Sequence, residues 1–386
     1  MKILHCCLAA FYIDNYGYQE NILPKMHKLQ GHNVEILAST ETYLNGIHLS
    51  YVDSGTYKNE NGITVTRLPY SRFMPHRVAT KLRLYKGVID KLLEFEPDII
   101  WLHDIQFLSI QQIIVFLKAN PSVIVYADGH ADFTNSATNW ISKNILHRII
   151  YKYCAQKIDP YVKKFYGTLP CRVDFFKDFY KVSNNKVELL VMGVDDTIIS
   201  RYDRSALRKS IRKQHNILDS DFLIISGGKL NIKKNIHNLV KAVVSINMDN
   251  VKLLLFGKPD EQVENIIEEY LSHESIIYIG WVNHIQIHEN LLAADLAVFP
   301  GKHSVIWEQA VGCGLPAIFK RIDGHNHVDL NGNCLFIDDG SEVSIKEALI
   351  RVLNDKDLFH TMKEVSRTEG MNHFSYFKIA ERSIES

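Results

Sequence analysis

Residues 226–235, with the sequence SGGKLNIKKN, combine residue types that bind phosphate groups. They follow an apolar run of strand length and precede an amphipathic run of helix length. Gly227 and Gly228 let the backbone come close to a ligand, and Lys229 and Lys234 supply positive charge. The free N–H groups at the start of the following helix add donors. The pattern predicts a phosphate-binding loop, although two lysines in one loop are also compatible with plain solvated charge.

The loop has neither the Walker A sequence nor the G-x-G-x-x-G pattern, and neither occurs elsewhere in the chain. Nucleoside triphosphate hydrolysis and simple dehydrogenase chemistry therefore lose their main sequence support.

A second candidate segment, residues 299–316, has the sequence FPGKHSVIWEQAVGCGLP and again predicts a strand, a short polar loop and a helix. Glu308 falls in the first turn of that helix. An acid at this position either interacts with the helix dipole alone or holds a ribose diol with both oxygens. Together with the lysine loop, the second interpretation is favoured.

A third candidate is the sequence YADGHAD, which contains Asp128, His130 and Asp132 at the end of an apolar run. Ligands bind at the carboxyl ends of strands in open α/β sheets. If the segment stays extended, the three side chains share one side and form a polar cluster. A capping aspartate with a loop histidine is the alternative. His103 and Asp104, which end the preceding strand, are the second choice for this site.

Two series of short apolar runs, separated by amphipathic stretches, surround these segments. Their near-continuous apolar character predicts parallel strands covered by helices on both faces. The predicted strands are residues 3–8, 33–37, 63–68, 99–102, 123–127 and 187–194, then 222–226, 251–256, 276–279, 296–299, 317–319 and 334–337. The predicted helices are residues 20–29, 82–95, 236–246, 263–271, 285–294 and 343–353. Two doubly wound α/β domains result.

In order and spacing, the candidate segments resemble the retaining nucleotide-sugar glycosyltransferases of family 4. The resemblance covers most of the chain and implies the GT-B architecture of two facing Rossmann-like domains. In that family a Gly-Lys pair, five residues before a second lysine, binds the donor diphosphate, and Lys229 and Lys234 have this spacing. The family's ribose-binding acid corresponds to Glu308.

Polar residues near 182–186, including Asn184 and Asn185, predict the boundary between the two domains. We expect an N-terminal acceptor-side domain over residues 1–185 and a C-terminal nucleotide-sugar domain over residues 186–370. Residues 371–386 would form the helix that crosses back to the first domain.

One position departs from the family pattern. In the family another acid precedes the one at Glu308, with seven residues between the two, and Pro300 stands at that position in this sequence. His303, Ser304 and the backbone of Val305 are the expected substitutes for donor binding in this shortened loop. In the first domain, the sequence YGYQENIL matches the family's Gly-Gly loop, and Gly17, the one glycine kept, is expected beside the donor phosphate.

The resemblance implies a metal-independent, retaining hexosyltransferase without a cofactor, with Asp128 and His130 as catalytic residues. Its partners would be a nucleoside-diphosphate sugar, most simply a UDP-sugar, and a hydroxyl of a glycan or lipid-linked saccharide in surface polysaccharide or glycoconjugate synthesis. A GT-B epimerase or phosphorylase, or a non-catalytic nucleotide- or glycan-binding protein, remains an alternative.

Composition limits the other partners. Forty-four basic and forty-four acidic residues cancel, which argues against nucleic-acid binding. No export signal or spanning segment is evident, so we expect a cytoplasmic protein.

Six cysteines without C-x-x-C spacing predict no disulfide or zinc site, and His325 and His327 are interpreted as loop residues. Two basic segments, residues 72–86 and 157–177, keep peripheral membrane contact open, the second because phenylalanines interleave with its charges.

Overall fold

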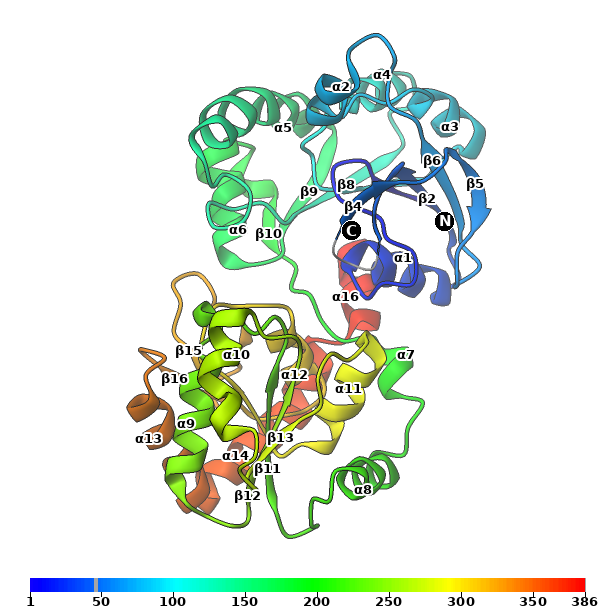
Figure 1. Ribbon diagram of the computed structural model, residues 1–386. Coiled ribbons are helices and arrows are strands. Elements are labelled where there is room, and N and C mark those ends of the chain that lie inside the picture. Colours follow the sequence, from blue (N-terminus) through cyan, green and yellow to red (C-terminus); the bar gives the residue numbers. More distant parts are fainter. Residues whose placement is uncertain (45–47, 386) are drawn as a thin grey trace. The chain divides into compact units, whose positions relative to one another are not determined.

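The computed structural model describes residues 1–44 and 48–385 of the chain and divides into two units (Figure 1). The first comprises Met1–Val191 and Ala380–Ser386, and the second comprises Met192–Ile379. The end of the chain thus returns to the first unit, as expected of the C-terminal segment. Ser386, the last residue of that expected segment, lies outside the described residues.

An eight-stranded sheet forms the centre of the first unit, in the order β10-β9-β8-β7-β1-β2-β6-β5. Neighbouring strands are parallel, except that β5 runs antiparallel to β6. The strands are β1 (Lys2–Cys7), β2 (Asn33–Ser39), β5 (Gly55–Lys58), β6 (Thr64–Leu68), β7 (Ile99–His103), β8 (Ile124–Gly129), β9 (Val162–Gly167) and β10 (Val187–Leu189), with β3 (Glu41–Leu44) and β4 (His48–Tyr51) as a separate antiparallel pair.

Helices enclose this sheet. They are α1 (Gln19–Leu29), α2 (His76–Leu82), α3 (Val88–Phe95), α4 (Ile110–Ala119), the π-helical segment Ser142–Tyr151, α5 (Lys152–Ile158), α6 (Pro170–Asp174) and a second π-helical segment, Phe175–Tyr180. Every residue of β7 is buried, as a strand covered on both faces requires.

The second unit contains a six-stranded parallel sheet in the order β13-β12-β11-β14-β15-β16. Its strands are β11 (Phe222–Gly227), β12 (Val251–Phe256), β13 (Ile276–Tyr278), β14 (Leu296–Phe299), β15 (Ala317–Lys320) and β16 (Cys334–Ile337). Its helices are α7 (Asp196–Ile199), α8 (Arg204–Gln214), α9 (Ile236–Ile246), α10 (Glu261–Ile267), α11 (His284–Ala293), α12 (Ile306–Gly312), α13 (Glu342–Asn354), α14 (Lys356–Val365), α15 (Met371–His373) and α16 (Tyr376–Ser383), whose last residues count with the first unit.

In each sheet the strand order reverses at one place, between β1 and β7 in the first unit and between β11 and β14 in the second. Beyond such a reversal the connecting loops diverge and leave a crevice at the carboxyl ends of the strands. The residues after β7 and β8 and those after β11 and β14 therefore lie where a ligand is expected to bind.

Two local predictions are wrong. The helix expected over residues 82–95 is α3 alone, because Arg83 adopts a left-handed conformation (φ +51°) that ends α2, and Gly87 (φ +90°) precedes α3. The strand expected over residues 187–194 ends at Leu189, and β9 was missed. Two adjacent lysines in β9 interrupt the apolar run that marks the other strands.

The phenylalanines within the second basic segment belong to the core. Phe165, Phe175 and Phe176 are buried in the first unit, and Phe165 lies in β9. They are therefore unavailable to a membrane surface. In the described part of the chain, no helix combines the length and apolarity needed to cross a bilayer.

Candidate functional site

In the second unit, the two predicted donor-binding loops touch. Lys302 N donates a hydrogen bond to Lys233 O (2.9 Å), and Asn235 Nδ2 donates to Pro300 O (2.9 Å). A Cβ on Gly301 would lie 2.4 Å from the Lys234 backbone, so only glycine allows this approach. The fold thus brings the loop after β11 against the loop after β14.

Lys234 is directed into this junction. Its Nζ donates to the carbonyl oxygens of Lys302 (2.6 Å) and His303 (3.2 Å). Burial, helped by the charge of Lys302, lowers the pKa of Lys234 to about 8. An anion bound here would stabilise the protonated form of the Lys234 amine and so raise its pKa again. Lys229 lies exposed earlier in the same loop, after Gly228 (φ +106°).

Glu308 is fully buried and is held by two histidines. His303 Nε2 lies 3.0 Å from Oε1 and 3.1 Å from Oε2, and His327 Nε2 lies 2.9 Å from Oε1. Burial raises the pKa of Glu308, but the two histidines outweigh this and hold it well below its usual range. The side chain is therefore an ionised acceptor at neutral pH.

The hydrogen bonds from the two histidines limit how the Glu308 carboxylate can bind a ribose. Both carboxylate oxygens are engaged, so a diol would have to displace the His303 ring from Oε2. Ser304 and Val305 are half-buried in the same loop, and their carbonyl oxygens accept the first backbone hydrogen bonds of α12. His327 was missed as a member of this group because it lies nineteen residues further along the chain, and no local pattern connects it to Glu308.

His303, Glu308 and His327 are also the residues that could hold a metal ion, since their ligand atoms lie within 4.8 Å of one another. Two imidazoles and a carboxylate suit zinc. However, the nitrogen–oxygen separations are ordinary hydrogen-bond distances, and Nδ1 of His327 has no partner among the described residues. Histidines that bind metals normally donate this second nitrogen to an acceptor. The geometry favours a hydrogen-bonded carboxylate.

Glu308→Gln is expected to fold and to bind nucleoside diphosphate roughly tenfold or more weakly, because a charge-assisted hydrogen bond contributes about 1.5–3 kcal/mol. Calorimetric titration with the nucleotide measures the change. Glu289→Gln, which alters a carboxylate bonded to Tyr202 in the same unit, is the control. A normal dissociation constant with a slightly lower melting temperature would assign Glu308 a purely structural role.

In the first unit, Asp128 is the centre of a buried cluster. Its Oδ2 accepts hydrogen bonds from Gln19 Nε2 (3.0 Å) and Trp101 Nε1 (3.0 Å). Its Oδ1 accepts from Asp104 N (3.2 Å). His103 Nδ1 lies 2.9 Å from Oδ2, an ion-pair distance at which the ring lacks linear hydrogen-bond geometry. Asp128 has no exposed surface and cannot itself touch a substrate.

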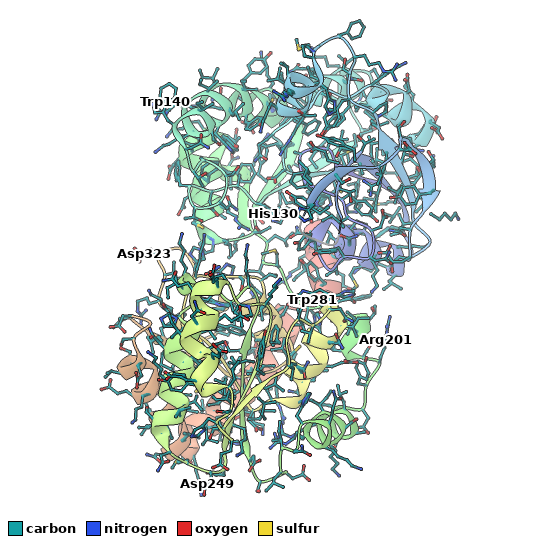
Figure 2. The ribbon with its side chains drawn as sticks, in the orientation of Figure 1. His130, Trp140, Arg201, Asp249, Trp281 and Asp323 are labelled. Carbon is teal, nitrogen blue, oxygen red and sulfur yellow. The ribbon has the colours of Figure 1, made fainter. Side chains whose placement is uncertain are left out.

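His130 is the member of this cluster that reaches the surface, with 22% of its side chain exposed (Figure 2). Its Nε2 lies 3.5 Å from Asp128 Oδ1. Burial lowers the pKa of His130, but the carboxylates of Asp128, Glu20 and Asp104 outweigh this and raise it to about 9. In Asp128, burial raises the pKa, and His103 and His130 together hold it below its usual range. At neutral pH His130 is thus a charged donor and not a base.

His103 and Asp104, the second choice from the sequence, belong to the same cluster. Asp104 adopts a left-handed backbone (φ +61°), a strained conformation that is frequent at functional sites. Its Oδ1 accepts from His130 N (3.0 Å). Asp132 does not join, because β8 ends at Gly129 and Asp132 turns towards Thr134 N (2.7 Å) instead.

A row of buried histidines extends from this cluster. His103 Nε2 lies 3.0 Å from His5 Nδ1, and His5 Nε2 lies 3.0 Å from His27 Nδ1. His27 Nε2 contacts Ala380 O (3.2 Å) and Ser383 Oγ (3.1 Å). Since a carbonyl oxygen only accepts, Nε2 of His27 carries the hydrogen, and its Nδ1 accepts from His5. Burial lowers the pKa of His27 to about 3 and that of His5 well below its ordinary value.

Gly17, the remaining candidate, lies in a half-buried loop two residues before α1. The structure therefore gathers Lys234, His303, Ser304, Val305 and Glu308 in the second unit, with Lys229 exposed in the adjoining loop. Asp128 and His130 form the cluster of the first unit.

The comparisons with known proteins agree with this fold. Residues 208–369 match the family model "Glycosyl transferases group 1". A capsular polysaccharide biosynthesis glycosyltransferase, CapM of Staphylococcus aureus, is 28% identical over 207 residues, which cover 50% of this chain and 52% of that protein. The chain spans about half the length of the curated relatives it matches.

Two solved structures share the fold over nearly the whole chain. Anabaena HepE in complex with UDP has a TM-score of 0.68 at 12% identity and covers 99% of this chain and 98% of its own. A UDP-GlcNAc 2-epimerase from Neisseria meningitidis has a TM-score of 0.64 at 12% identity, with the same coverage. The two Rossmann-like units are those of the GT-B fold, which confirms the predicted fold class. Within this fold, the match to the group 1 glycosyltransferase family spans residues 208–369 of the second unit.

Proposed function

We propose that the protein is a metal-independent, retaining glycosyltransferase that moves a hexose from a nucleoside-diphosphate sugar, a UDP-sugar in the simplest case, to a hydroxyl of a glycan or lipid-linked saccharide. Surface polysaccharide or glycoconjugate synthesis in the cytoplasm is the proposed setting. The observation that carries the proposal is Lys234, half-buried with a lowered pKa beside the loop that leads to Glu308, inside the segment that matches the group 1 family.

In this proposal the donor lies across the second unit's loops. Lys229 and Lys234 bind the diphosphate, and Glu308 binds the ribose, with His303, Ser304 and the Val305 backbone completing the loop. Negative charge grows on the leaving diphosphate as the anomeric bond breaks, so the lysines act mainly on the transition state. Gly17 would leave room for the phosphates on the side of the first domain.

His130 is the proposed catalytic residue of the first domain. Protonated at neutral pH, it donates a hydrogen bond to the sugar or the acceptor. Asp128, being buried, acts through His130 by fixing its position and charge, and is better described as a positioning residue.

Two alternatives remain. An epimerase would use the same loops, and the fold shared with the UDP-GlcNAc 2-epimerase favours considering it. A non-catalytic nucleotide- or glycan-binding protein is consistent with Pro300 at the position of the family's first acid.

A panel of nucleotide sugars, incubated with and without glycan acceptors, tests the proposal. We expect nucleotide release that depends on the acceptor and a product that keeps the donor's anomeric configuration. Activity should survive EDTA, because lysines supply the positive charge. Isomerised donor without acceptor would identify an epimerase, binding without turnover a binding protein, and activity restored by added metal would contradict the metal-independent mechanism.

A further inference from the structure

The helical segment that begins near Trp140 carries an uncovered apolar face. It runs through the π-helical residues Ser142–Tyr151 into α5, in the first unit. Figure 2 shows Trp140 at the outer edge of that unit, directed away from its body. The exposed side chains of this face, which we call the Trp140 stripe, are Trp140 (70%), Ile141 (60%), Ile145 (40%), Ile149 (62%) and Tyr153 (45%).

From Ile141 onward the members of the stripe recur every fourth residue, so each lies next to the previous one on the surface of the helical segment. The opposite face of the segment packs into the first unit, where His147, Tyr151 and Cys154 are buried. The segment therefore has two apolar faces, and one of them has no cover.

The charges within the segment itself are all positive. The sequence has no acidic residue between Asp132 and Asp159, whereas four cations flank the apolar side chains: Lys143, Arg148, Lys152 and Lys157. Lys143 Nζ lies 5.0 Å from the centre of the Phe133 ring and Lys157 Nζ lies 5.5 Å from that of Tyr153. Their ammonium groups are thus held at the level of the apolar face.

We propose that the Trp140 stripe rests on an anionic lipid bilayer. Aliphatic side chains insert at the interface, a tryptophan lies at the level of the headgroups, and lysines and arginines bind anionic lipid. A second copy of the chain fits less well, because a symmetric contact would place these cations against each other. The link to a lipid-linked acceptor rests on the proposed function, but the lipid contact itself does not.

Trp140 can report on this contact. Trp101 and Trp307 are fully buried, and Trp281 is the other exposed tryptophan, so Trp281→Phe leaves Trp140 as the accessible fluorophore. We expect its emission to shift to the blue with vesicles containing phosphatidylglycerol, and to remain unchanged with pure phosphatidylcholine. Raised salt should weaken the response.

The double variant Ile145→Ser/Ile149→Ser should lose roughly tenfold or more in vesicle affinity, measured by co-sedimentation without donor or acceptor. The matched control is Leu93→Ser/Val115→Ser, which removes two similarly exposed apolar residues from α3 and α4. Melting temperatures establish that both variants fold.

Absence of binding to anionic vesicles, or equal loss in stripe and control variants, would overturn the proposal. A concentration-dependent dimer that the stripe variant abolishes would also overturn it and assign the surface to a second copy. Because these measurements need no substrate, their failure would leave the transferase proposal standing, and inactivity of the enzyme would leave the lipid contact standing.

Discussion

Lys234→Ala is expected to bind nucleoside diphosphate roughly ten- to a hundredfold more weakly and to transfer sugar more slowly still. The lost contact is charge-assisted and contributes about 1.5–3 kcal/mol. Lys234 also ties the two loops together through the carbonyls of Lys302 and His303, so its removal loosens the donor site itself. Lys229→Ala, which removes an exposed charge of the same loop, should also weaken nucleotide binding and slow transfer, but by a smaller factor.

Lys233→Ala is the matched control, because Lys233 is an exposed lysine directly before Lys234. Calorimetry with nucleoside diphosphate measures binding, and acceptor-dependent nucleotide release measures turnover. If Lys234→Ala and Lys229→Ala both bind as tightly as Lys233→Ala, the phosphate-binding loop has been misassigned.

His130→Ala is expected to reduce the transfer rate by roughly 10²–10⁴, the range typical of a positioned proton donor, while nucleotide affinity stays nearly constant. Because the pKa of His130 is raised to about 9, the rate should fall as pH rises through that value. Asp128→Asn removes the carboxylate that raises this pKa, so the falling limb should move to lower pH.

The shift of the pH profile in Asp128→Asn distinguishes a residue that positions His130 from one that only stabilises the fold. Asp132→Asn is the control, because Asp132 lies in the same segment but bonds to Thr134 and Arg172. It should lower the melting temperature without moving the pH profile. Wild-type transfer rates in both His130→Ala and Asp128→Asn, or an unmoved limb in the latter, would remove this cluster from the mechanism.

The sequence predicted the sheets well because parallel strands are apolar at nearly every position, as in β12 and β14. It failed where charge lies within a strand, as at the paired lysines of β9, and where one left-handed residue, Arg83, divides a helical pattern. Those features depend on tertiary packing and on backbone conformation, which side-chain periodicity does not encode.

Candidate site residues that lie within one continuous segment were predictable from the sequence, and their partners from distant segments were not. Lys229, Lys234 and Glu308 lie in continuous strand–loop–helix segments that a pattern can identify. The partners that set their chemistry come from elsewhere: His327 reaches Glu308 across nineteen residues, and His103 reaches Asp128 from the neighbouring strand. The exposed face near Trp140 was missed because sequence hydrophobicity does not reveal which face is covered.

The histidine row in the first unit has a consequence for resistance to acid. His27 and His5 are neutral when folded but would each take up a proton in the unfolded chain below its ordinary pKa of 6.5. Their contribution to the free energy of unfolding is therefore intact above pH 6.5 and is lost as pH falls towards 3, at up to roughly 1.4 kcal/mol per pH unit for each ring. His147, with a pKa lowered to about 4 by burial and by the charge of Arg83, adds to the effect. Mild acidification is thus expected to destabilise the first unit through histidines buried in its interior.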